Sequence, residues 1–411
     1  MTRIGTLIFQ FEVWIALILV AVSIYEPEYL PVGLAGFFII FCLRFFIFKH
    51  FTKHTWADLL IVIIFLMSVV SLLISIDPQR TREQTMRLWI GIGMFYSIIN
   101  WVDSRSRLRL LVSVIILAGF FLALITPFIT AWNLQFLLPE FTFYRVIPTI
   151  TDDPANPNVI AGSLSLFFLL CFGMLLLGWK FVTKIEKLLL LLTLVSTMFL
   201  LLFTQSRGAI ISAVLSGIVV ISIKIKKGWL IPILTILAVI LLGERGNSYQ
   251  YLESLTGGSA ISGVVGRVEI WSRAIFMLED YPYTGIGIGL FGPVADTLYP
   301  FYEYSTQLVE HAHNIFLQIG VDLGIPGLIS WIAILGLSIM SAAQIVRREK
   351  GTWLMSLGAG LLASQVSIIL HGLTDSVLWG MVRPSPLIWI FWGLIYSAFS
   401  LSVRFVDEKT R

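Results

Sequence analysis

Long runs of apolar residues, separated by short charged connections, make up most of this chain. A helix needs about 20 apolar residues to cross the hydrocarbon core of a bilayer. Twelve runs reach or approach that length, at residues 4–25, 29–48, 57–76, 88–102, 108–131, 158–179, 185–203, 208–223, 229–243, 328–346, 352–375 and 385–403. The pattern therefore predicts an all-α polytopic integral membrane protein with about twelve transmembrane helices.

The composition excludes a soluble globular protein. Hydrophobic residues make up 57% of the chain and charged residues 13%, with a mean hydropathy of +0.91, whereas soluble domains carry about 25% charged residues. Cys42 and Cys171 lie in separate apolar runs, so we expect no disulfide. No small-residue cleavage site follows the first run, and a second span begins at once, so we expect the first run to be retained.

Lys and Arg gather in alternate connections, which predicts the orientation of the chain in the membrane. The clusters lie at Arg3 and at residues 44–53, 105–109, 180–187, 224–227, 347–350 and 404–411. We therefore expect a multi-pass protein of the cytoplasmic (inner) membrane with both termini in the cytoplasm.

The basic residues expected on the outer face are all arginines. They are Arg80, Arg82, Arg87, Arg145, Arg207, Arg245, Arg267, Arg273 and Arg383. A guanidinium group binds phosphate bidentately, whereas a Lys ammonium is a point charge. The bias indicates that some of these arginines bind anions, and snorkelling at helix ends is the alternative. For Arg80, Arg82 and Arg87 we expect contact with phosphates of a lipid headgroup or acceptor.

Two outer connections are long enough to fold by themselves, at residues 132–157 and 244–312. The second has three Arg against eight acidic residues, which predicts a solvated acidic subdomain and no nucleic-acid partner. The expected organisation has three parts: residues 1–243 with transmembrane helices 1–9 and the outer loop at 132–157; residues 244–327 with an extracytoplasmic helical subdomain and an interfacial helix; and residues 328–411 with transmembrane helices 10–12 and a cytoplasmic tail.

The outer subdomain contains a helical pattern from Gly266 to Pro282. Arg273 pairs with Glu269 at i, i+4, which explains its presence. Arg267 has no such partner, and we place it in the first helical turn, where free N–H groups beside an Arg make an anion site. We therefore expect Arg267 to bind phosphate or pyrophosphate. A salt bridge to a loop acid such as Glu253 is the alternative.

Two short turns carry further signals. The turn from Thr204 to Ala209 joins two apolar runs and leaves Arg207 at the membrane boundary, where it either snorkels or meets a lipid-linked phosphate.

The segment from Thr284 to Gly292 superficially resembles a dinucleotide fingerprint, but no βαβ unit surrounds it. Its glycines are better explained as sites where the backbone turns tightly or approaches a ligand.

The stretch from His311 to Gly327 holds the strongest candidate for a base. Asn314, Gln318 and Asp322 fall at i, i+4, i+8 and form a polar stripe on a helix expected to lie at the interface, which Gly324, Pro326 and Gly327 break. His313, in the first turn, would stay neutral beside the positive end of the dipole, as a general base requires. A simple polar cap is the alternative.

Weaker candidates lie beside this stretch and at two other places. Glu310 and His311 precede His313 and are expected to contact substrate together with Asn314 and Gln318. Asn158 is a candidate N-cap and substrate contact, and Asp152 with Asp153 lacks the further ligands of a metal site. His371 and Asp375, at i, i+4, are able to pair. We therefore expect no metal or cofactor.

Several motifs, in order, resemble the O-antigen ligase and O-antigen polymerase superfamily over essentially the whole chain. His313 and Asn314, followed by Gly324 and Gly327, resemble its outer-loop motif. The Ser-Arg-Gly turn at Arg207, the helix from Arg267 to Trp271 with the glycine-rich segment after it, and the Asn156–Asn158 element are also similar.

This resemblance implies a metal-independent, inverting glycosyltransferase of the lipid-linked-sugar type, with a GT-C-like fold, acting in lipopolysaccharide biosynthesis at the cell envelope. The donor would be a glycan on undecaprenyl diphosphate and the acceptor a sugar of the lipid A core or another glycan, met at the periplasmic face of the membrane. By this resemblance His313 is the base, and Arg207 and Arg267 hold the diphosphate.

Other functions stay open at this point. O-antigen polymerase has the same motif and the same charges, but takes a second lipid-linked repeat unit as its acceptor. The full match of the histidine motif favours the ligase. An anion or sugar transporter is a second alternative, which predicts ionisable residues along a pathway at mid-membrane.

Overall fold

The structure, a computed structural model, describes residues 9–25, 27–132, 149–151, 154–225, 227–228, 230–231, 233–234, 259–302, 309–379 and 386–409. Across these residues the chain is helical, and the β-type pairing within them is an isolated bridge between Thr130 and Ala155. The all-α prediction is therefore confirmed for the described part of the chain.

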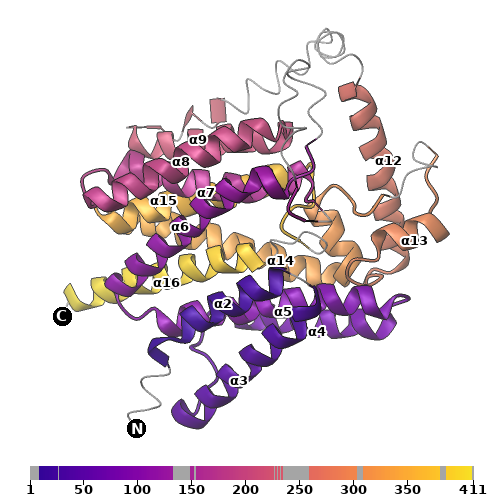
Figure 1. Ribbon diagram of the computed structural model, residues 1–411, viewed down its shortest axis with the longest axis horizontal. Coiled ribbons are helices and arrows are strands. Elements are labelled where there is room, and N and C mark those ends of the chain that lie inside the picture. The colour runs from indigo at the N-terminus through magenta and orange to yellow at the C-terminus, as the bar shows by residue number, and fades with distance from the viewer. Residues whose placement is uncertain are drawn as a thin grey trace.

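Helices make up most of the described chain (Figure 1). In chain order they are α2 (Glu12–Tyr25), the 3-10 helix η1 (Pro27–Tyr29), α3 (Leu30–Phe48), α4 (Asp58–Ile74), α5 (Pro78–Trp101), α6 (Arg105–Ile129), α7 (Pro157–Gly178), α8 (Lys184–Phe203), α9 (Arg207–Lys224), α12 (Ser259–Asp280), α13 (Phe291–Leu298), α14 (Ile315–Arg348), α15 (Trp353–Gly372) and α16 (Pro386–Lys409).

Eleven of the twelve expected spans overlap one of these helices. Most of the remaining span, residues 229–243, lies outside the described residues. Eight of the described helices are long and apolar enough to cross a membrane, and α2 and α4 contain shorter apolar helices. The multi-pass membrane class is therefore supported, while the count of twelve stays a prediction. Helix α5 starts at Pro78 rather than near residue 88, because Asp77 caps it by accepting a hydrogen bond from Arg80 N–H at 3.1 Å.

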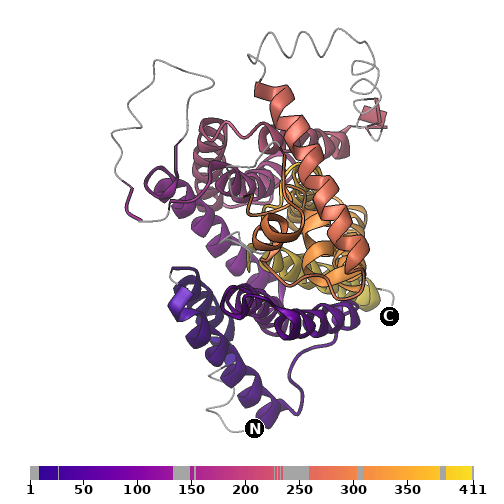
Figure 2. The same ribbon diagram turned by 90° about the vertical axis from the view of Figure 1, so that its right-hand side faces the viewer.

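The helices form two groups that α14 and α16 join (Figures 1 and 2). Helices α2, α3, α4 and α5 make the N-terminal group, and α6 to α9 with α15 make the other. Helix α16 packs on α5, and α14 packs on both α4 and α15. Close approach of α7 and α15 depends on Gly173 and Gly360, since a Cβ built on either would lie 2.5–2.6 Å from backbone atoms of the facing helix.

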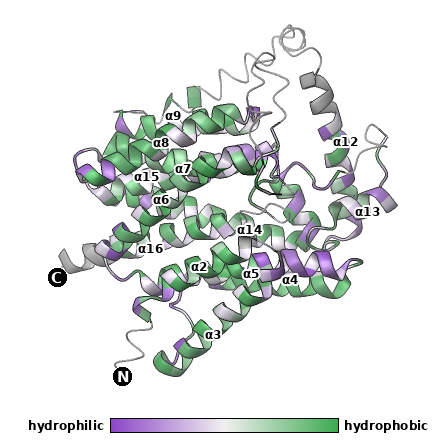
Figure 3. Cartoon of the chain, in the orientation of Figure 1, coloured by the Kyte–Doolittle hydropathy of each residue, from purple (hydrophilic) through white to green (hydrophobic). Residues whose placement is uncertain are grey.

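Helix α14 is two helices joined at Gly324, which has φ 68° and ψ −179°. The predicted break is therefore confirmed at Gly324, while Pro326 lies inside the second helical part. The first part carries the polar stripe, and α12 packs against α14. Hydrophilic residues gather at this end of the bundle, around α13 and the start of α5 (Figure 3).

Candidate functional site

The loop before α14 brings the two histidines to the end of the bundle. Asn314 caps α14, because its Oδ1 accepts hydrogen bonds from the N–H groups of Phe316 and Leu317 at 3.0 and 3.1 Å. Its Nδ2 donates to the carbonyl of Leu373, at the end of α15. His313 therefore precedes the helix, and the expectation that it lies in the first turn was wrong.

His313 has a strained backbone, with φ 46° at a residue that carries a Cβ. Trp271 on α12 donates a hydrogen bond from its indole N–H to the His313 carbonyl at 3.4 Å. The imidazole is 30% exposed, which leaves it partly accessible. The position of His313 is thus fixed from both sides, by the cap residue after it and by α12.

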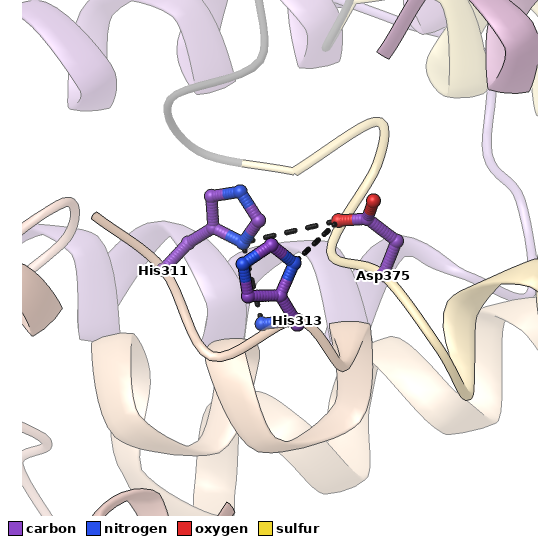
Figure 4. Close-up of side chains that lie close together, drawn as sticks. All are labelled: His311, His313 and Asp375. Atoms are coloured by element: carbon purple, nitrogen blue, oxygen red, sulfur yellow. Dashed lines mark hydrogen bonds and ion pairs between the residues drawn. The ribbon is translucent and has the colours of Figure 1, made fainter. Parts of the chain in front are cut away.

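Asp375, just beyond the end of α15, faces both histidines (Figure 4). Its Oδ1 lies 3.5 Å from Nδ1 of His313 and 3.8 Å from Nδ1 of His311, and the two imidazole rings are 4.1 Å apart between centroids. Nδ1 of His313 forms no hydrogen bond within the described residues, so at 3.5 Å it is in close contact with Asp375 without a hydrogen bond.

His311 is held as a neutral imidazole. Its Nδ1 accepts a hydrogen bond from the backbone N–H of His313 at 3.2 Å, and it lies 2.8 Å from the hydroxyl oxygen of Ser376. An amide N–H is only a donor, so this nitrogen is unprotonated and the Ser376 hydroxyl donates to it. Burial, together with the charges of His313 and Arg267, lowers the pKa of His311 to about 4, although Asp375 opposes the shift.

Asp375 is the anion of this cluster. Burial acts to raise the pKa of Asp375, but the contact with His313 and the charges of His311, His313 and His371 outweigh it and lower the pKa below its usual value. The Asp375 Oδ1 also accepts a hydrogen bond from the backbone N–H of Ser376 at 2.8 Å. The carboxylate is therefore ionised at neutral pH and directed at the histidines.

Arg267 lies within electrostatic range of His311, since its charge contributes to the low pKa of that imidazole. Helix α12 begins at Ser259, so Arg267 occupies its third turn and not the first, as expected from the sequence. The N–H groups of a helix interior are used within the helix, so an anion site formed by a helix N-terminus at this residue is excluded. Any anion contact here comes from the guanidinium group alone.

Arg207 has the position that the sequence suggested for Arg267. It is the first residue of α9, after Ser206 as N-cap, and its side chain is exposed. A Cβ built on Gly208 would lie 2.6 Å from Thr374 Oγ1 and 3.2 Å from a ring carbon of His371. The start of α9 therefore packs directly against the segment that carries Asp375.

A buried carboxyl group below the histidines connects three segments. Asp322 is fully buried, and its oxygens accept hydrogen bonds from Gly289 N–H at 3.2 Å, Gln318 Nε2 at 2.9 Å and Trp379 Nε1 at 2.8 Å. The Oε1 of Gln318 accepts a hydrogen bond from the N–H of Ala312, between the two histidines, at 2.8 Å. The polar stripe thus faces the protein, and both ends of the Gln318 amide are engaged within it.

The glycine-rich segment packs against the break in α14. Gly285, Gly287 and Gly289 all have positive φ values, which glycine adopts without strain. A Cβ on Gly285 would lie 2.6 Å from the Val321 carbonyl oxygen, and a Cβ on Gly324 would lie 2.7 Å from backbone atoms of Tyr283. The expectation of tight turns is confirmed, and the close approach in the structure is to the backbone of α14, while contact with a ligand stays a prediction.

The remaining predicted residues take varied positions. Glu310 is exposed, Arg82 is exposed, and Arg87 is buried within α5. Arg80 is close enough to Asp322 for an electrostatic interaction. Asn158 is not a cap: Asn156 caps α7, accepting from Asn158 N–H at 2.9 Å, because Pro157 takes the first helical position. Asp152 and Asp153 lie outside the described residues.

Sequence reasoning paired Asp375 with His371 and missed its contact with the other two histidines. Asp375 lies after the end of α15, where it interacts electrostatically with His371 and also faces His311 and His313. The three residues also form a group that could hold a metal ion, with their ligand atoms all within 4.8 Å of one another. No periodicity links residues so far apart in the chain.

A family model described as O-antigen ligase matches residues 188–332. The matched segment includes Arg207, Arg267 and His313, and it ends before Asp375. No curated protein matches the chain. The family match supports the resemblance seen in the sequence, and the apolar helices support a multi-pass membrane protein.

Proposed function

We propose, from the premise that residues 188–332 match the O-antigen ligase family, that this protein transfers a glycan from undecaprenyl diphosphate to a hydroxyl group of an acceptor at the outer face of the cytoplasmic membrane. The favoured acceptor is a sugar of the lipid A core. The observation that carries the proposal is the grouping of His311, the partly exposed His313 and Asp375, with the charge of Arg267 within electrostatic range of His311.

His313 is the proposed base. A sugar hydroxyl is a poor acid, so its attack needs a group that removes the proton as the new bond forms. With a proton on Nδ1 directed at Asp375, the second ring nitrogen, Nε2, carries the free lone pair. The 3.5 Å separation between His313 Nδ1 and Asp375 Oδ1 is long for a hydrogen bond, and such contacts often tighten when substrate binds.

Arg207 and Arg267 are the proposed diphosphate ligands. The leaving group is an anion, and fixed positive charge stabilises it as the bond to the sugar breaks. Arg207 lies at the start of α9, so its guanidinium group is close to the backbone N–H groups of the first helical turn. Both the guanidinium group and these N–H groups attract phosphate. Arg267, on α12, approaches from the side of His311.

The proposed step is a single displacement. The acceptor oxygen bonds to the anomeric carbon as its proton passes to His313, and the bond from that carbon to the diphosphate oxygen breaks. Undecaprenyl diphosphate leaves with the electron pair, and attack from the opposite face inverts the anomeric configuration. The charges of the arginines replace the role that a metal ion has in other diphosphate chemistry.

The test uses purified protein in detergent with a glycan on undecaprenyl diphosphate, with and without lipid A core, and product analysis by mass spectrometry. We expect glycan on the core without added metal. His313→Ala should lower the rate by about 10²- to 10⁴-fold, and Arg267→Ala by about 10²- to 10³-fold. Arg267→Lys keeps the positive charge but loses the bidentate guanidinium group. Its rate should lie between that of Arg267→Ala and that of the wild type.

One control and two possible results decide the outcome. His54→Ala removes a fully exposed histidine and should keep wild-type activity. Full activity of His313→Ala would remove the proposed base. Glycan that lengthens on the lipid carrier with no core present would identify a polymerase, which uses the same residues with a different acceptor.

A further inference from the structure

We propose that His311, His313 and Asp375 form a binding site for a divalent transition-metal ion of the zinc type, and that the bound ion inhibits the transferase. The site itself is argued from its geometry and donor atoms, and its inhibitory effect rests on the proposed function. The ion is a regulator or poison of the reaction here, and not its cofactor.

The spacing of the ligand atoms suits zinc. Zinc binds nitrogen and oxygen ligands at about 2.0–2.2 Å in a tetrahedral arrangement, which places neighbouring ligand atoms roughly 3.3–3.5 Å apart. The Asp375 oxygen lies 3.5 Å from His313 Nδ1 and 3.8 Å from His311 Nδ1. One ligand atom from each of the three residues lies within 4.8 Å of the other two, so side-chain rotation is sufficient to bring the set to the tetrahedral spacing.

The donor chemistry also suits the ion. Zinc needs unprotonated imidazole nitrogens and an ionised carboxylate. His311 Nδ1 is already unprotonated in the structure, since it accepts the backbone N–H of His313. Two imidazoles and one carboxylate leave a fourth position open for water or a phosphate oxygen.

Neighbouring groups set the expected strength of binding. The ion has to displace two contacts of His311 Nδ1, one from Ser376 and one from the backbone of His313. Arg267 adds a nearby positive charge that opposes a cation. Asp375 supplies the only carboxylate in the group of three. These opposing effects argue for reversible binding rather than a permanently held structural metal.

Inhibition follows from the tautomer of His313. A metal ion on Nδ1 takes the lone pair of that nitrogen, so the proton of the neutral ring moves to Nε2. Nε2 is then a donor and has no lone pair to accept the proton of the acceptor hydroxyl. The ion also neutralises Asp375, which otherwise orients the ring.

The experiment titrates tag-free, purified protein in detergent with Co²⁺, whose absorption bands report tetrahedral coordination, and then displaces it with Zn²⁺. We expect one ion per chain in the wild type. Binding should weaken at least tenfold in His311→Ala and, separately, in Asp375→Asn, which keeps the shape of the side chain. His50→Ala removes an exposed histidine elsewhere and should bind as wild type does.

The outcomes separate the site from the function. Absence of tetrahedral Co²⁺ bands in folded wild-type protein, or equal affinity in all variants, would overturn the site. With glycan donor and acceptor present, Zn²⁺ should abolish transfer in wild type and in His50→Ala, and EDTA should restore it. Binding without inhibition would overturn the inhibitory role. Binding in a protein that transfers no glycan would overturn the proposed function and leave the site standing.

Discussion

Replacing Asp322 by Asn should destabilise the protein although the two side chains have nearly the same shape. Three donors surround the carboxyl group: Gly289 N–H, Gln318 Nε2 and Trp379 Nε1. An Asn amide has only one acceptor oxygen. With that oxygen toward Gly289 and Gln318, its NH₂ group faces the indole N–H of Trp379.

The other orientations of the amide in the Asp322→Asn variant are no better. Turning the amide satisfies Trp379 but leaves Gly289 and Gln318 facing an NH₂ group. Rotating Gln318 as well would direct its own NH₂ group at the N–H of Ala312, whose acceptor is Gln318 Oε1. Every arrangement therefore leaves at least one buried donor unpaired, which costs about 1–3 kcal/mol.

The measured effect is a shift in melting temperature. An unfolding entropy of about 2.1 cal/mol/K per residue gives roughly 1 °C per kcal/mol for a chain of 411 residues. The midpoint of Asp322→Asn in detergent should therefore fall by about 1–3 °C. Asp322→Ala, which leaves all three donors unpaired, should lose about 3 kcal/mol or more. Asp296→Asn makes the same chemical change at an exposed position of α13 and should not shift the midpoint.

A double-mutant cycle tests the reasoning behind the number. Trp379→Phe removes the indole donor, so in combination with Asp322→Asn it removes the conflict that the amide creates. The loss in the double variant should be smaller than the sum of the two single losses by about 1 kcal/mol. Additive losses, or a midpoint of Asp322→Asn equal to wild type, would refute the hydrogen-bond argument.

Two further predictions follow from the same region. Gly324→Ala should destabilise the protein by several °C in a thermal scan, because a Cβ would lie 2.7 Å from backbone atoms of Tyr283 and because φ is +68°; Gly336→Ala on the same helix has nothing within 4 Å and should be neutral or stabilising by about 0.5–1 kcal/mol. Because the pKa of His311 is lowered to about 4, the unfolded chain binds more protons than the folded one between pH 6.5 and 4. Stability should therefore fall by about 3 kcal/mol as the pH drops through that window. His311→Gln should remove this contribution, so that stability falls less than in the wild type in thermal scans at stepped pH, and an unchanged pH dependence would contradict the argument.

The all-helical class, the candidate spans and the break at Gly324 could be predicted from the sequence. Each depends on local rules: apolar length, the φ freedom of glycine and the missing N–H of proline. The glycines from Gly285 to Gly289 were likewise identified as sites of tight turns. These features are decided within a few residues, so the order of side chains along the chain is sufficient to reveal them.

Helix boundaries were less certain, and their errors changed two interpretations. Helix α12 begins at Ser259, which moves Arg267 away from a helix start, and α7 is capped by Asn156 rather than Asn158. For α7 a polar residue directly before an apolar run was ambiguous between neighbouring positions, and Pro157 decided it. Arg207, at the start of α9, has the local environment that had been expected for Arg267.

The sequence by itself determined which side chains are able to act, and the tertiary structure decided which of them meet. His313 was identifiable from its motif, but its partner Asp375 comes from a different element, the segment after α15. Its Oδ1 lies 3.5 Å from His313 Nδ1. Asp322 was expected on an interfacial stripe, yet it is buried against donors from two other segments. Such pairings arise from helix packing across the bundle, where α14 joins α4, α15 and α16. No local pattern encodes them, because they depend on contacts between residues distant in the chain.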